Sequence, residues 1–423
     1  MKYKKKVLKN GLRIIVVPMK DNPTVTVMTL VEAGSKYEDK SINGLSHFLE
    51  HMCFKGTKRR PNAIAVSQEL DSIGANSNAY TSHEYTGYYA KAGAKQFGKI
   101  LDIVADMYIN PLFKQSEIDK ERGVIIEEIN LYQDLPMRIV WDVYTELLYG
   151  DQPVGRTIIG PKENINKFTS KDFRTYRDKH YVASATTVIV AGNVDTTKVF
   201  KEVEKAFAGI STGKKAGKKK VDDSQKKASI KTKFKKTDQA HLILGVRGVS
   251  LNSKDKTIAG VLAGVLGKGM SSRLFSKLRD EMGVCYYVRA GHDAETDHGD
   301  FSISTGVSVN RVEEVIGVLI DELKRLTVEE VPEEELKKTK EILNAGLMLN
   351  LEASDDIADF FGFQELYHMD INTPAEVAKK IRAVTSKDLL RVAKKLIKTD
   401  KLNLAIVGPY KDSKKFTKLL KIK

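Results

Sequence analysis

One order of segments occurs twice along the chain, and this repeat limits the possible folds more than any other feature of the sequence. The β-rich run at residues 24–31 has a counterpart at residues 240–249. The segment K-S-I-N-G at residues 40–44 has a counterpart in K-T-I-A-G at residues 256–260, 216 positions later. A repeat of this length indicates two homologous structural units. The chain length of 423 residues agrees, because it exceeds what one ordinary core can hold.

Strand and helix signals occur in both repeats. Residues 2–18 alternate in polarity around Asn10-Gly11, which is a strong signal for a hairpin. In the second half, a β-rich run at residues 301–309 precedes an amphipathic helix pattern at residues 313–326. We therefore expect an α+β fold with two homologous α/β sandwiches, in each of which a mixed or antiparallel sheet is covered by helices.

A Lys-rich segment separates the two repeats. Residues 211–236 hold 11 Lys and 2 Asp, and they account for +9 of the net charge of +15. Such a run is typical of a solvated linker. We expect a first domain at residues 1–210, this linker, and a second domain at residues 237–423.

The composition also narrows the classes of partner. A net charge of +15 is compatible with nucleic acid binding, but the basic clusters lack the interleaved aromatic side chains of a single-strand groove. No run approaches the about 18 apolar residues of a membrane helix, and the N-terminus lacks the apolar core of a signal peptide. Two cysteines, Cys53 and Cys285, give no disulfide framework. We expect a cytoplasmic protein without nucleic acid or membrane partners.

Residues 44–53 read G-L-S-H-F-L-E-H-M-C and place two histidines around a glutamate. The apolar spacing predicts a helix with one packed side. His47 and His51 are four residues apart, so they share a face of that helix. Both imidazoles can bind one zinc ion, which in hydrolytic sites takes three protein ligands and keeps an open position for water. Glu50 is then the base that takes the proton from water, as in the inverted zinc-peptidase motif H-x-x-E-H.

A solvated helix face without chemistry is the alternative interpretation of this motif, which is incomplete without a third ligand. The repeat argues for chemistry. The second half has no ionisable group at the three corresponding positions, which are Ala263, Leu266 and Gly267. If the histidines served only the scaffold, both halves would need them. We therefore expect a catalytic first half and a supporting second half.

Further motifs occur in both halves. They are N-A-Y-T at residues 78–81, E-R-G-V-I-I-E-E at 121–128, D-L-P at 134–136, G-x-x-P-x-G-R-x-x-x-G at 150–160, G-M-S-S-R-L-F at 269–275, and Arg279 followed by Tyr286. Together with H-F-L-E-H, these motifs resemble those of the pitrilysin and insulin-degrading enzyme family, especially its short members similar to mitochondrial processing peptidase. The resemblance spans nearly the whole chain.

The resemblance implies a complete metal site with one zinc ion per chain. The family's distal ligand is the glutamate seven residues after the Glu of the E-R pair, which here is Glu128. Helical geometry agrees, because seven residues are almost two turns: Glu121 and Glu128 share a face, and Glu127 points away. Glu121 is implied to assist catalysis by orienting a ligand or tuning the bound water.

The resemblance also implies residues that bind the substrate. Arg279 and Tyr286 match a pair that anchors the substrate from a non-catalytic domain and helps to stabilise the oxyanion. Asn78 and Ala79 match an edge strand that pairs with the peptide backbone. We expect the residues that follow, 83–84, to be ordinary strand or turn residues.

The function implied by the family is that of a zinc-dependent endopeptidase, which cleaves unstructured peptides or processes leader and targeting sequences. One chain holds both the zinc motif and the Arg–Tyr pair. The resemblance therefore implies a homodimer in which each chain forms half of a clamshell around the peptide. A heterodimer with a degenerate sister chain and a non-catalytic scaffold subunit of the same family are the open alternatives.

Overall fold

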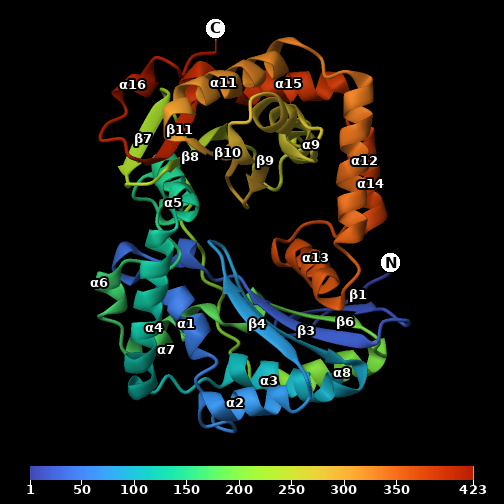
Figure 1. Cartoon of the computed structure of the whole chain (residues 1–423). Coiled ribbons are helices and arrows are strands. Elements are labelled where there is room, and N and C mark those ends of the chain that lie inside the picture. Colours follow the sequence, from blue (N-terminus) through green and yellow to red (C-terminus); the bar gives the residue numbers. More distant parts are fainter. Residues whose placement is uncertain (423) are drawn as a thin grey trace. The chain divides into compact units, whose positions relative to one another are not determined.

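The computed structural model describes residues 1–422 and contains two compact units, each built around one β-sheet (Figure 1). Unit 1 comprises residues 1–129, 157–219 and 349–374. Unit 2 comprises residues 130–156, 220–348 and the chain from residue 375 onward. Each unit thus contains a segment from the other half of the sequence, and this division differs from the two contiguous domains expected from the repeat.

Unit 1 is built on a six-stranded sheet with the order β1-β2-β6-β3-β5-β4. The strands are β1 Lys4–Val7, β2 Arg13–Pro18, β3 Thr24–Val31, β4 Asn76–Thr81, β5 Thr86–Gly93 and β6 Thr186–Gly192. β2 and β6 are parallel, and the other neighbours are antiparallel. The central strands are buried on both faces, which explains their continuous apolar runs. β4 is an edge strand.

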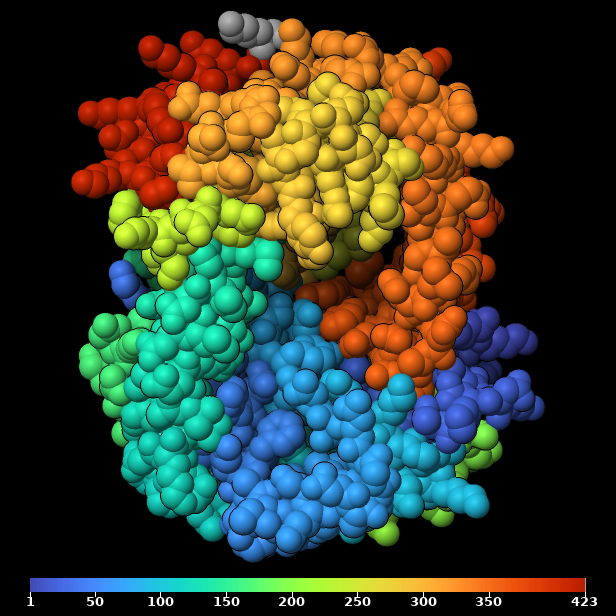
Figure 2. Space-filling model, in the orientation of Figure 1, coloured from blue at the N-terminus to red at the C-terminus, as the bar shows by residue number. Residues whose placement is uncertain are grey.

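Helices cover both faces of this sheet. They are α1 Leu45–Met52, α2 Ala63–Asp71, α3 Phe97–Ile109, the first part of α4 Gln115–Asp134, α6 Lys162–Ile165, α7 Ser170–His180, α8 Thr196–Ala206 and α13 Ser354–Leu366. The core on one face packs Val25 and Val27 of β3 with α1, α3, α7 and α8. On the other face, Met28 of β3 packs with Ile357 and Phe361 of α13. Figure 2 shows α2 and its neighbouring segments, in blue, on the surface of unit 1.

Unit 2 is built on a five-stranded sheet with the order β7-β11-β8-β10-β9. The strands are β7 Ser229–Phe234, β8 Gln239–Arg247, β9 Cys285–Ala294, β10 Gly299–Ser308 and β11 Asn403–Gly408. The helices are α5 Pro136–Tyr149, α9 Lys256–Gly267, α10 Arg273–Phe275 with a π-helical turn Ser276–Glu281, α11 Val312–Val328, α12 Glu333–Leu349, α14 Pro374–Ala383, α15 Ser386–Leu396 and α16 Lys414–Thr417. None of the helices described in residues 1–422 combines the length and the apolar character needed to span a bilayer.

The same elements recur in the two units at a nearly constant spacing, and the predicted α+β fold class is confirmed. β2 and β7 begin 216 positions apart, as do α7 and α15. Both of these helices start with a capping box, formed by Thr169 with Asp172 and by Thr385 with Asp388. The repeat therefore extends to the hydrogen bonds that begin equivalent helices.

Helices α5 and α13 occupy equivalent places in the two repeats, and they are exchanged between the units (Figure 1). α5 comes from the first half of the sequence but packs against β8 and β11 in unit 2. α13 comes from the second half but packs against β3 and β6 in unit 1. Periodicity identifies the apolar face of a helix but not the sheet that this face covers. The exchange was therefore not predicted.

The segment at residues 211–236, expected to be a solvated linker, is only partly a linker. Its residues 229–234 form β7, which pairs in parallel with β11. Lys218 pairs with Glu84 at 2.5 Å and Lys219 pairs with Asp39 at 2.8 Å, and all four residues belong to unit 1. These lysines neutralise acidic side chains of the chain itself, which corrects the expectation of a fully solvated segment.

Candidate metal centre

Helix α1, which carries the H-x-x-E-H motif, starts in a backbone conformation that favours glycine. Gly44 has a φ of +101°, and a Cβ atom there would lie 2.6 Å from the carbonyl oxygen of Ile159. Glu38 caps the first turn, because its carboxylate accepts hydrogen bonds from the N–H groups of Gly44 and Ser46 at 2.8 and 2.6 Å. Burial raises the pKa of Glu38 to about 7, although these bonds lower it. The apolar residues of α1 are buried, so the helix presents its motif in a fixed direction.

Three side chains from two helices converge in unit 1: His47 and His51 of α1, and Glu128 of α4. Their ligand atoms lie within 4.8 Å of one another. The Nε2 atoms of His47 and His51 lie 3.7 and 3.8 Å from Oε2 of Glu128. These distances exceed those of hydrogen bonds, so the three ligand atoms surround a common point. Glu127 is exposed, which agrees with the helical geometry expected for α4.

Glu121 links His51 to Lys55. Nδ1 of His51 lies 2.9 Å from Oε1 of Glu121, and Nζ of Lys55 lies 2.5 Å from Oε2. A carboxylate only accepts hydrogen bonds, so Nδ1 carries the hydrogen and the neutral ring keeps its lone pair on Nε2. Burial raises the pKa of Glu121, but the bonds from His51 and Lys55 lower it overall. Glu121 thus selects the tautomer that a metal ligand needs.

Glu50 lies beside the cluster with its carboxylate largely buried. The residue is 8% exposed, and its Oε2 accepts a hydrogen bond from the hydroxyl of Thr81 on β4 at 2.6 Å. Burial raises the pKa of Glu50, with Glu128 acting in the same direction and Thr81 and His51 opposing it. Burial lowers the pKa of His51, but the acidic groups around it, led by Glu121, raise it overall. A carboxylate with a raised pKa binds a proton more readily than an ordinary one, which suits a group that takes up and returns a proton.

The donor set fits a zinc ion. Two imidazoles and one carboxylate are a ligand combination that zinc uses in hydrolytic sites, with a further position open to water. The bond between His51 and Glu121 is the outer contact that orients such an imidazole. Within residues 1–422, no other three side chains of His, Cys, Asp or Glu bring ligand atoms together in this way.

Arg279 and Tyr286 lie against each other in unit 2. Arg279 is on the π-helical turn, and its Nη1 donates a hydrogen bond to the carbonyl oxygen of Tyr286 at 2.9 Å. Its guanidinium lies 5.0 and 5.1 Å from the ring centres of Phe275 and Tyr286. The Tyr286 residue is 78% exposed. The predicted pair is therefore close together and accessible, in the unit that does not hold the histidine cluster.

Asn78 and Ala79 lie on β4, the edge strand that contacts α1. β4 pairs with β5 on one side, and the side-chain oxygen of Asn78 accepts a hydrogen bond from the N–H of Ala79 at 2.8 Å. Asn78 is exposed and Ala79 is half-buried. An edge strand in this place can pair with an extended peptide through backbone groups.

The equivalent helix of unit 2, α9, has no room for the motif. Ala263 and Leu266, in the places of His47 and Glu50, are 3% and 0% exposed. Gly267 is in the place of His51, and a Cβ atom there would lie 2.4 Å from the backbone nitrogen of Ala290. The absence of the H-x-x-E-H side chains from this repeat is therefore matched by its packing.

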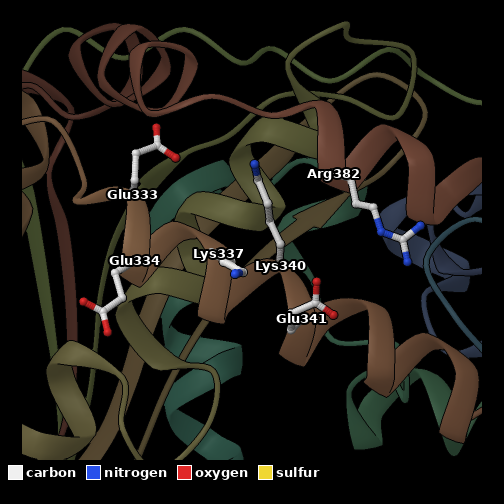
Figure 3. A pocket seen from close by; sticks show the side chains of 6 residues that line it. All are labelled: Glu333, Glu334, Lys337, Lys340, Glu341 and Arg382. Atoms are coloured by element: carbon white, nitrogen blue, oxygen red, sulfur yellow. The ribbon is translucent and has the colours of Figure 1, made fainter.

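An open groove of about 480 Å³ in unit 2 is a separate feature (Figure 3). Its lining residues are Glu333, Glu334, Lys337, Lys340 and Glu341 of α12 and Arg382 of α14. The charges of these six side chains balance, and the side chains spread along the two helices instead of converging. The groove contains none of the predicted site residues.

Sequence reasoning missed several residues that support the site. Lys55 is four residues after His51, a spacing that could have indicated a shared direction, but α1 ends at Met52. The sequence shows Thr81 only as the last residue of N-A-Y-T. Glu84 was expected to be an ordinary strand or turn residue, yet its side chain is 1% exposed and pairs with Lys36 at 2.7 Å.

Two family models match successive parts of the chain. The model described as insulinase (peptidase family M16) matches residues 13–162. The model described as the peptidase M16 inactive domain matches residues 167–343. The first match contains all the residues of the histidine cluster, and the second contains Arg279 and Tyr286.

Individual proteins are similar over almost the full chain. A protein of Bacillus subtilis named uncharacterized zinc protease YmxG is 34% identical over 404 residues, which are 95% of this chain and 97% of that protein. An uncharacterized zinc protease of Streptomyces coelicolor is 31% identical, over 96% of this chain and 89% of the relative. The crystal structure of a protease from Helicobacter pylori superimposes with a TM-score of 0.89 at 25% identity, covering 96% of this chain and 99% of that one.

Proposed function

This chain belongs to the insulinase family of peptidases, M16, and from this membership and the site we propose that it is a zinc-dependent endopeptidase. The observation that carries the proposal is the convergence of His47, His51 and Glu128 next to the buried carboxylate of Glu50. The first repeat is the catalytic one. The second repeat, whose residues up to 343 lie within the match to a model of an inactive domain, contributes substrate contacts.

The residues of the cluster have distinct roles in the proposed reaction. His47 and His51, through their Nε2 atoms, and the Glu128 carboxylate hold one zinc ion per chain. When bound, this ion supplies the Lewis acidity that makes water a nucleophile near neutral pH and stabilises the developing oxyanion. Oε1 of Glu50 takes the proton from the attacking water, because Oε2 is engaged by Thr81, and returns it to the leaving amine.

Substrate binding is assigned to an edge strand and an exposed Arg–Tyr pair. An extended peptide pairs with β4 at Asn78 and Ala79, and main-chain hydrogen bonds give affinity with little choice of side chain. Arg279 and Tyr286 anchor the peptide and support the oxyanion. These contacts suit unstructured peptides, which include leader and targeting sequences.

Metal removal tests the proposed activity directly. We expect the purified protein to hold one zinc ion per chain and to cleave a quenched, unstructured peptide, because the site has three protein ligands and a base. A chelator should abolish the cleavage, and added zinc should restore it. Zinc content is measured by elemental analysis and cleavage by fluorescence. Zinc without cleavage would instead support the scaffold alternative, and cleavage that survives complete metal removal would overturn the proposal.

We further propose a homodimer in which Arg279 and Tyr286 of one chain serve the metal site of the other, forming the two halves of a clamshell. Neither a Glu50→Gln chain nor an Arg279→Ala, Tyr286→Phe chain should be active alone. Their mixture should regain about a quarter of the wild-type rate, because random pairing of a two-fold dimer leaves one intact site in half of the dimers. The rate and the molar mass of the mixture are the measurements.

The mixing experiment, together with assays of the chain in the presence of a different protein, separates three assemblies. If the variants form dimers and their mixture stays inactive, the Arg–Tyr pair acts at the metal site of its own chain. If a monomer cleaves peptides, the dimer is removed from the proposal. If the chain is active only with a different protein, it is a subunit of a heterodimer.

We also propose a cytoplasmic location. Both cysteines are free, which suits a reducing compartment.

A further inference from the structure

A hydrogen bond between two elements sets the direction of the proposed base. Oγ1 of Thr81 donates to Oε2 of Glu50 at 2.6 Å. Glu50 lies on α1 and Thr81 is the last residue of β4, so the bond joins the motif helix to the edge strand. Threonine is β-branched and its χ1 angle has few alternatives. The direction of the hydroxyl therefore follows the backbone of the strand.

The turn between β4 and β5 is itself held against the 3-10 helix Ser35–Tyr37, which precedes α1. The N–H of Ser35 donates to the carbonyl of Ser82 at 3.2 Å, and the N–H of Lys36 donates to the carbonyl of His83 at 2.8 Å. The Ser35 hydroxyl also lies 2.9 Å from Nδ1 of His83. These bonds fix the backbone immediately after Thr81.

A buried ion pair joins the same two segments. Nζ of Lys36 lies 2.7 Å from Oε1 of Glu84, and the two side chains are 0% and 1% exposed. Lys218 reaches the same carboxylate oxygen at 2.5 Å. The opposite charges of Lys36 and Glu84 compensate each other in a buried place, so the pair favours one arrangement of the turn. Lys36, Glu84 and Lys218, which have no role in the proposed reaction, thus stabilise the end of β4 that carries Thr81.

From these contacts we infer that Thr81 is a positioning residue for Glu50, held in place by the turn that Lys36 and Glu84 lock. The inference rests on the proposed function, because it assigns Thr81 a role through the base. The hydroxyl keeps Oε2 of Glu50 occupied and directs Oε1 towards the reacting water. A peptide paired with β4 is thereby bound to the same strand that orients the base.

The test compares three single variants of the full-length, zinc-loaded protein. Thr81→Val keeps the shape of the side chain and removes the donor, and Thr81→Ser keeps the donor. Thr327→Val is the matched control, because Thr327 lies on α11 in unit 2 and its hydroxyl donates to a backbone carbonyl, that of Lys324. We expect kcat of Thr81→Val to fall about 10–100-fold with KM unchanged, since a misplaced catalytic group costs about this much. Thr81→Ser should retain most of kcat, and Thr327→Val all of it.

Crystal structures of the same variants give a readout that does not depend on activity. The Glu50 carboxylate should keep its orientation in Thr81→Ser and leave it in Thr81→Val, while zinc content stays at the wild-type level in both. If the wild type cleaves peptides and Thr81→Val has the same kcat, or if Glu50 does not move in Thr81→Val, the inference is wrong. If the wild type cleaves nothing, the proposed function fails, and the orientation of Glu50 still decides whether Thr81 positions it.

Discussion

Replacing Glu50 by Gln is expected to lower kcat for peptide cleavage by about 10²–10⁴-fold, the range that a general base contributes. Glutamine has the same shape and can still accept the hydrogen bond from Thr81, but it cannot take a proton from water. The ligand atoms of His47, His51 and Glu128 are untouched by the substitution. Zinc content should therefore stay at one ion per chain, and the melting temperature should change little.

The measurements are the cleavage of a quenched peptide, elemental analysis of the purified variant and its thermal unfolding. Loss of cleavage together with retained zinc assigns the proton transfer to Glu50. Cleavage at the wild-type rate by a fully zinc-loaded variant would falsify that assignment. Loss of zinc or of folding along with activity would show that Glu50 serves the metal site or the core of unit 1 instead.

Replacing Glu128 by Gln is expected to remove the metal, whereas the same change at the neighbouring Glu127 should have no effect. The Glu128 carboxylate supplies the only negative charge among the three proposed ligands, and it lies 3.7 and 3.8 Å from the two imidazoles. Glu127 is exposed on the same helix. Loss of a ligand should weaken zinc binding by more than the about 10–100-fold that loss of an outer partner costs.

Adjacent glutamates make this a matched pair, because both substitutions remove one charge from α4. Zinc affinity is measured by competition with a chromogenic chelator, and cleavage is measured beside it. Equal affinities for Glu128→Gln and wild type would show that α4 does not supply the third ligand. A loss in both variants would point to the net charge of the helix, and not to coordination.

Much of the proposed site could be predicted because it depends on spacing along single helices. His47, Glu50 and His51 occupy two turns of α1, and Glu121 and Glu128 are seven residues apart on α4. Helical periodicity alone orients such residues. The meeting of α1 with α4 was a prediction from family resemblance, since no local pattern states which helices pack together.

Contacts between distant elements were not predicted. Lys55 and Thr81 each bond to a site carboxylate, but Lys55 lies beyond the end of α1 and Thr81 reaches Glu50 from another element. The burial of Glu84 also depends on Lys36 and Lys218, which are 48 and 134 positions away in the sequence. The presence of a charged or hydroxyl residue in a sequence does not indicate which distant residue it contacts.

The sequence by itself determined the α+β class, the repeat and the direction of the motif residues, because each of these follows from local periodicity and from spacing along one element. Only the tertiary structure decided which sheet each helix covers: α5 packs in unit 2 and α13 in unit 1, opposite to their places in the chain. Hydrophobic burial is non-directional and rewards any apolar surface that fits. The choice between two similar sheets is therefore made by the packing of the whole chain, and no local pattern records it.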